Sequence, residues 1–286
     1  MVLTRRAVAI LTGAAGAFAL VHALPASAST GSMAPTTNAR SAATPASTGT
    51  TSTVATTTTT PVSGSPAAKA LLARAMAAIK TEKGFRTLSV ESSGNMVLTL
   101  LTAAGTNRGW QTVKLTGQAQ GTEALTVLLM GPTAYLKGNK AGLANYMRFT
   151  AAAAGGEAGS WIGSTSASSS KVETYFYQSL AAGLTVKTAA SEIQLVGKLS
   201  MGADTMVHGL RVHDIKMFLT HGQQVAHGDL YVRATGKPLP VYESVIASTG
   251  VHDEITTSNW GQEPTVNVPK KFVPVELGWL DRSAWG

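Results

Sequence analysis

The feature that most constrains the fold of this chain is a change in its hydrophobic period, from helical spacing before Gly84 to alternation after it. Beyond that glycine, apolar residues alternate largely with Ser, Thr and Lys in four segments, which Gly or Asn separates. Alternation of this kind predicts antiparallel strands with one apolar face. The apolar positions of the four expected strands are Leu88 and Val90; Met96, Leu98 and Leu100; Val113 and Leu115; and Leu125, Val127 and Leu129.

Helical spacing occurs in three places. Ser65 and Pro66 form a favourable helix start and Gly84 a favourable stop, so a helix is expected between them. Helical segments are also expected at 143–154 and 172–184. A second set of strands is expected at 193–201, 206–219, 225–234, 239–247 and 251–257. Strands, then helices, then strands, without βαβ alternation, predict the α+β class.

The N-terminus has the pattern of a signal peptide. Arg5 and Arg6 precede an apolar run at 7–21, which is shorter than the roughly 20 residues that a membrane-spanning helix needs. The Ala-Ser-Ala sequence ending at Ala28 fits the small-residue specificity of signal peptidase. We therefore expect residues 1–28 to be removed, by the Sec or the Tat route, and the mature protein to be secreted or to lie in the extracytoplasmic cell envelope.

The segment after the signal peptide is dominated by Ser, Thr, Ala, Pro and Gly. Residues 29–65 contain too little apolar surface to offset the entropy of ordering, so they are expected to form a disordered linker. Its composition is also typical of O-glycosylated stalks. The ordered domain is then expected at 66–272, followed by a C-terminal tail at 273–286.

Cysteine usage and charge exclude several classes of function. The chain has no cysteine, so it has no thiol for a lipid anchor, a disulfide or a Cys-based metal site. Its formal net charge is +8, but no Lys/Arg cluster is interleaved with aromatic residues, which argues against a nucleic-acid partner. The positive charge serves solubility or a peripheral contact with an anionic membrane surface.

No catalytic motif is complete. The Ser-x-x-Lys sequence at 168–171 lacks the partner motifs of penicillin-binding enzymes. The adjacent carboxylates Asp253 and Glu254 are expected on opposite faces of a strand. A cluster of histidines and acids leaves a metal-dependent hydrolase as a weaker alternative: His208, His213, His221 and His227, with Asp214 and Asp229 nearby. Because three of these histidines adjoin glycines, solvated turns are the simpler interpretation, and we expect neither an enzyme nor a bound metal or cofactor.

Four segments resemble a known family. They are Thr133–Asn139 (TAYLKGN), the pair Trp161 and Ile162, Tyr231–Glu243 (YVRATGKPLPVYE) and Trp260–Pro269 (WGQEPTVNVP). With the helix that opens the domain, they resemble the actinobacterial LppX/LprG-type envelope lipoproteins, which share the fold of the lipoprotein carrier LolA. The resemblance covers about residues 66–272. It implies a strongly curved antiparallel sheet, a half-barrel whose concave face is covered by helices, with a cavity for acyl chains between them.

The resemblance also implies a function, although the lipidated cysteine of the family is missing here. The expected function is non-enzymatic binding, carrying or sensing a lipid or another apolar ligand in the envelope. An extracytoplasmic sensor that contacts a protein partner is the main alternative. The expected ligand-facing residues are the apolar phase of the strands, which a filled core would explain equally well: Leu98, Leu100, Val113, Leu115, Leu125, Val127, Leu195 and Leu199.

Overall fold

The computed structural model describes residues 63–117, 121–192, 197–221 and 224–280. The expected signal peptide, nearly all of the expected linker, Leu195 and the end of the expected tail lie outside these ranges. Across the described ranges, no helix combines the length and the apolar character that a membrane span requires.

The described residues form one curved, open sheet of 14 strands. Its path runs β1-β8-β10-β11-β12-β13-β2-β3-β4-β5-β6-β7-β14, and β9 pairs with β10 off this path. Neighbouring strands are antiparallel except at the two ends, where β1 pairs with β8 and β14 with β7 in parallel. The strand bounds are β1 Ser63–Gly64, β2 Gly84–Ser93, β3 Met96–Gly105, β4 Arg108–Thr116, β5 Glu123–Met130, β6 Thr133–Gly138, β7 Ile162–Thr165, β8 Lys198–Met201, β9 Thr205–Val207, β10 Leu210–His221, β11 Gln224–Arg233, β12 Pro240–Ala247, β13 Val251–Ser258 and β14 Val273–Pro274.

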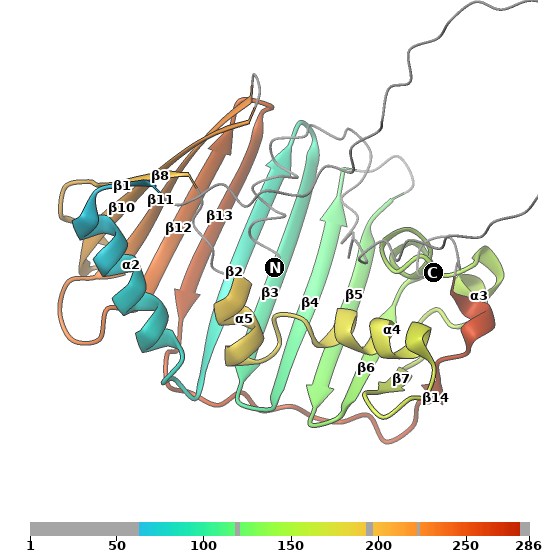
Figure 1. Cartoon of the computed structure of the whole chain (residues 1–286). Helices are drawn as coiled ribbons and strands as arrows, with labels where there is room; N and C mark the ends of the chain where they lie inside the picture. The colour runs from blue at the N-terminus through green and yellow to red at the C-terminus, as the bar shows by residue number, and fades with distance from the viewer. Residues whose placement is uncertain (1–62, 118–120, 193–196, 222–223, 281–286) are drawn as a thin grey trace, which may run out of the picture.

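Helices cover one face of this sheet, which we call the inner face. Figure 1 shows α2, α5 and α4 in front of successive parts of it. The helix bounds are α2 Pro66–Ile79, the π-helical turn η1 Gly142–Tyr146, α3 Ala151–Gly156, α4 Lys171–Ala181, α5 Val186–Glu192 and the 3-10 turn η2 Leu277–Trp279. The α+β class and the curved antiparallel sheet with helices on one face are therefore confirmed.

Local structure differs from expectation at several places, including the following. The helix expected at 143–154 is divided into η1 and α3, because Arg148 between them has a left-handed φ of 57°. Strand β6 and helix α5 were not expected at all. β6 is a short apolar run of the kind that periodicity cannot assign, and α5 has only Val186 as a large apolar residue.

The inner face carries two large hydrophobic clusters and a small one between them. The first lies beneath α4 and contains Phe176 and Leu180 of that helix against strands β3 to β6. The second lies beneath α2 and packs Leu71 and Ala75 against β8, β10, β11 and β12. The third joins the end of α2 to α5 and to Phe85 of β2. The apolar core is thus interrupted near the middle of the sheet.

Strand β2 presents the opposite set of alternating side chains to the core from the set that was expected. Leu88 was expected on the core-facing side, but its side chain is 42% exposed, whereas Phe85 and Ser89 are buried on the inner face. A strand shows alternate residues to opposite faces, so packing Phe85 inward necessarily turns Leu88 and Val90 outward. The ring of Phe85 packs on Trp260, with 4.7 Å between the ring centroids, and this distant contact fixes the orientation of β2.

Structure extends beyond both ends of the expected domain. Gly64 of β1 pairs with Leu199, and a Cβ at Gly64 would lie 2.0 Å from the Leu199 carbonyl oxygen. At the other end, Val273 and Pro274 form β14, and Leu280 is buried in the cluster beneath α4. Residues 273–280 are therefore part of the folded body.

The outer face of the sheet carries a buried carboxylate. The Asp214 side chain is 6% exposed, and Lys216 Nζ lies 3.1 Å from Asp214 Oδ2 and 2.7 Å from Asp229 Oδ1. Burial raises the pKa of Asp214 above its ordinary value of 3.8. Hydrogen bonds to Asp229 and Asp214 raise the pKa of Lys216. The lysine thus offsets the cost of ionising a buried acid.

We expect Lys216→Met to lower the free energy of unfolding at pH 7 by roughly 1 kcal/mol, since it leaves two carboxylates without their cation. A carboxyl whose folded pKa is raised favours folding below its unfolded pKa, and this contribution is lost as the pH rises through the folded pKa. The deficit of the variant should therefore shrink as the pH falls and the buried Asp214 carboxyl becomes protonated. Urea unfolding between pH 7 and 4 measures it, with the exposed Lys114→Met as control. A deficit independent of pH would contradict this account.

Candidate ligand site

A row of polar side chains crosses the middle of the inner face. Strand register places Thr257 of β13 opposite Thr87 of β2, Thr87 opposite Thr102 of β3, and Thr102 opposite Gln111 of β4. Gln111 Nε2 donates a hydrogen bond of 2.9 Å to Thr102 Oγ1. The row ends at Val127 of β5, which lies opposite Gln111 and belongs to the cluster beneath α4.

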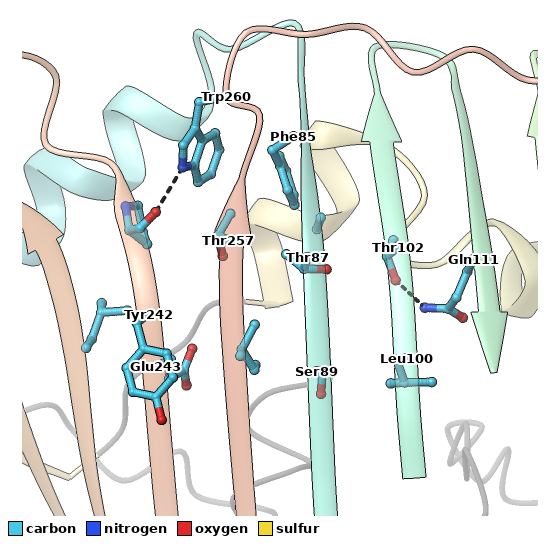
Figure 2. Close-up of a pocket in the computed structure, with 15 residues that line it drawn as sticks. Phe85, Thr87, Ser89, Leu100, Thr102, Gln111, Tyr242, Glu243, Thr257 and Trp260 are labelled. Carbon is cyan, nitrogen blue, oxygen red and sulfur yellow. Dashed lines mark hydrogen bonds between the residues drawn. The ribbon is translucent and has the colours of Figure 1, made fainter. Parts of the chain in front are cut away.

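A cavity of about 80 Å³ lies over this polar row. Figure 2 shows polar side chains from β2, β3 and β4 along the cavity, with Phe85 and Trp260 toward one end. Trp260 is held in place because its Nε1 donates to the Pro240 carbonyl oxygen at 2.9 Å. The lining residues are Phe85, Thr87, Ser89, Leu100, Thr102, Gln111, Gly183, Ala189, Leu230, Pro240, Tyr242, Glu243, Ile255, Thr257 and Trp260.

Buried acids lie at the cavity and beside it. Glu243 of β12 is 6% exposed and lies between Leu230 and Ile255 of the neighbouring strands, both of which line the cavity. Asp253 of β13 is 2% exposed and accepts a 3.1 Å hydrogen bond from Ser89 Oγ. Glu243 and Asp253 therefore place carboxyl groups at the cavity and beside it.

Small residues line the cavity on the helix side. Ala189 of α5 and Gly183, in the link before α5, line it. Among the α5 residues whose side chains are described, Val186, Ala189 and Ala190 join the third hydrophobic cluster. Because the hydrophobic free energy is proportional to the apolar area buried, α5 is held far less strongly than α4, which buries Phe176 and Leu180. Helix α5 thus costs less to displace than α4.

The expected ligand-facing residues occupy three places in the structure. Leu100 lines the cavity. It also belongs to the cluster beneath α4, and Leu199 lies in the cluster beneath α2. Leu195 lies outside the described residues. The rest of the set is buried in the cluster beneath α4: Leu98, Val113, Leu115, Leu125 and Val127.

Sequence reasoning missed most of the cavity lining. Thr87, Thr102, Gln111 and Thr257 come from four strands, and each looks like an ordinary polar residue of an alternating segment. The sequence of β2 contains one indication of the cavity, because the residues that face the same side as Phe85 are polar: Thr87, Ser89 and Glu91. A polar phase inside a central strand indicates a face that is not filled by core.

The described histidines of the expected cluster have separate partners, and the side chain of His221 lies outside the described part of the chain. His213 Nδ1 lies 2.7 Å from Asp204 Oδ1, His227 stacks on Phe218 with 5.0 Å between ring centroids, and His208 lies against Tyr242 at 6.1 Å. Within the part of the chain that the structure describes, no group of three or more His, Asp or Glu side chains is placed to hold a metal ion. Asp253 and Glu254 face opposite sides of β13, as expected, with Asp253 buried and Glu254 exposed.

No protein-family model and no curated protein match the chain. Among solved structures, the chain is similar to the lipoprotein LppX of Mycobacterium tuberculosis, at 12% identity and a TM-score of 0.43, over 71% of this chain and 100% of LppX. It is also similar to LprF from Mycobacterium bovis, at 14% identity and a TM-score of 0.46, over 72% of this chain and 99% of LprF. A complex of MucB with MucA is matched at 12% identity and a TM-score of 0.36, over 69% of this chain and 57% of the matched chain. The resemblance to LppX-type lipoproteins thus recurs among solved structures, as a likeness of fold.

Proposed function

We propose that this protein is an exported, non-enzymatic binding protein that carries or senses a lipid or another amphipathic molecule in the cell envelope. The cavity over the polar row is the observation that supports this function. It combines aromatic and aliphatic walls, from Phe85, Leu230 and Trp260, with hydroxyl, amide and carboxyl groups on the strands. Binding sites for small molecules have this composition, a mostly apolar wall with a few placed polar groups.

The size of the cavity indicates how a ligand enters. About 80 Å³ is less than the roughly 150 Å³ of an engineered apolar cavity that takes up one benzene ring. A lipid chain therefore requires the cavity to widen. Displacing α5 removes Val186, Ala189 and Ala190 from the third hydrophobic cluster, whereas displacing a core strand would expose many large side chains. We infer that ligand enters between α5 and the central strands.

A cavity-filling variant tests this function. Ala189→Phe should place a ring in the cavity from α5 and weaken binding of a fluorescent fatty acid by about tenfold or more, because one buried aromatic ring occupies most of the available volume. Displacement of the probe by lipids extracted from the host measures the affinity. The matched control is Ala152→Phe, at an exposed position of α3. Thermal melting of both variants separates lost binding from lost folding.

Native mass spectrometry identifies the ligand directly. Protein purified from its own host should carry a bound molecule that solvent extraction removes, and Ala189→Phe should carry less of it than Ala152→Phe. Full binding by folded Ala189→Phe would place the ligand elsewhere and contradict the proposal.

A further inference from the structure

The C-terminal segment follows one edge of the sheet. After β13 it runs along the lower edge in Figure 1 until it forms β14 beside β7. It is attached to strand ends along the way. Thr106 donates through its backbone N and its Oγ1 to the two carboxylate oxygens of Glu263, at 3.0 and 3.1 Å. The backbone N of Val273 donates to the Trp161 carbonyl oxygen at 2.9 Å.

This segment exposes apolar and basic side chains together. Four of its large apolar residues are between 36% and 47% exposed, and two lysines between them are exposed as well. Val273 lies beside the inward-facing Ile162 in the β14–β7 pairing, so it faces the opposite side of the sheet from Phe272. The other five residues form what we call the edge patch: Val268, Lys270, Lys271, Phe272 and Leu277.

The aromatic ring of the edge patch, that of Phe272, packs against neighbouring residues that fix its orientation. Phe272 packs edge-on against Tyr135 of β6, with 5.2 Å between ring centroids and an angle of 76°. A Cβ at Gly163 of β7 would lie 2.5 Å from Phe272 Cδ2, so the glycine leaves room for the ring. Phe272 is therefore held in a fixed orientation while 47% of its surface remains in solvent.

A third basic residue adjoins the edge patch. Lys137 Nζ lies 5.8 Å from the ring centroid of Trp161, the residue whose carbonyl oxygen accepts from Val273. Glu276 is the single acidic residue between 268 and 277. Cations therefore outnumber anions at this edge, in keeping with the formal net charge of +8 of the whole chain.

We propose that the edge patch is a contact surface for an anionic lipid bilayer. Such a bilayer surface has an apolar acyl region beneath a layer of anionic headgroups. The apolar side chains of the patch can enter the boundary of the acyl region, and the lysines beside them can contact the headgroups. A ring of Trp161 beside the patch suits the same boundary. The segment that carries the patch begins at Trp260, which lines the aromatic end of the cavity. The proposed bilayer contact is therefore on the same edge of the sheet as that end of the cavity.

Vesicle co-sedimentation of the chain without residues 1–28 tests this proposal. We expect binding to phosphatidylcholine vesicles only when they contain phosphatidylglycerol, and binding that declines with salt. Phe272→Ser and the double variant Lys270→Glu/Lys271→Glu should each weaken it about tenfold or more.

Two controls match these variants closely. Phe218→Ser removes another exposed ring: Phe218 of β10 is 41% exposed, and its ring centroid lies 5.0 Å from that of His227 on β11. Lys69→Glu/Lys80→Glu makes the same change in net charge at two exposed positions, one in α2 and one directly after it. Both should bind vesicles within about twofold of the parent.

Equal losses in patch and control variants would overturn the proposal. So would unaffected vesicle binding by folded patch variants, or capture of a protein partner through Phe272 without any vesicle binding. Because Ala189→Phe leaves the edge patch intact, it should still bind vesicles, and so failure at the cavity and failure at the patch are distinguishable.

Discussion

Phe176→Ala is expected to lower the free energy of unfolding by about 3 to 5 kcal/mol, the largest effect of any substitution considered for this protein. Phe176 is fully buried in the cluster beneath α4, and its ring lies 5.9 Å from that of Phe149. Its removal leaves a cavity between α4 and the sheet that close-packed neighbours cannot fill. For a domain of this size, the loss corresponds to a fall of roughly 10 °C in Tm.

Thermal melting and urea unfolding measure this effect, with Gln178→Ala as the matched control. Gln178 lies in the same helix but is exposed, so its loss should change Tm by no more than about 2 °C. A small effect of Phe176→Ala would mean that α4 does not anchor the helical layer. Helix α5 would then be no easier to displace from the sheet than α4.

Leu115→Trp is expected to have the second largest effect, and it separates a filled core from an open acyl site. Leu115 is 2% exposed in the cluster beneath α4 and lies opposite Leu98. A larger ring there must displace its neighbours, which costs roughly 1 to 3 kcal/mol or more. Because the cavity over the polar row is outside the immediate surroundings of Leu115, fatty-acid affinity of the remaining folded protein should stay unchanged.

The opposite pattern would relocate the ligand. If Leu115→Trp abolished fatty-acid binding and left Tm unchanged, the strand face around Leu98, Leu115 and Val127 would line the acyl site. Melting and probe displacement on Leu115→Trp and Ala189→Phe, measured together, decide between the two locations.

Much of the fold could be predicted from the alternation of residue types. Segments such as 96–100 and 125–129 place only apolar residues in one phase and a mixture of Thr and apolar residues in the other, so one orientation buries such a strand more favourably. The positions Leu98, Leu125 and Val127 are buried on the inner face for this reason. Helix α2 was predictable too, because its apolar stripe and its Pro66 start are local features.

Strand β2 and helix α5 could not be predicted in this way. Both phases of β2 mix apolar and polar residues, so a contact with Trp260, far away in the sequence, decides which phase faces inward. Helix α5 has too few apolar residues for a clear period, and tertiary packing of Val186 and Ala190 determines its position.

The sequence by itself determined which residues alternate, and hence the α+β class and the apolar strand phases beneath α4. The cavity was decided by tertiary structure alone. Thr257, Thr87, Thr102 and Gln111 are unremarkable one at a time, and only the register of four strands aligns them in one row. Register depends on pairing between strands that lie far apart in the chain, so no local pattern encodes it.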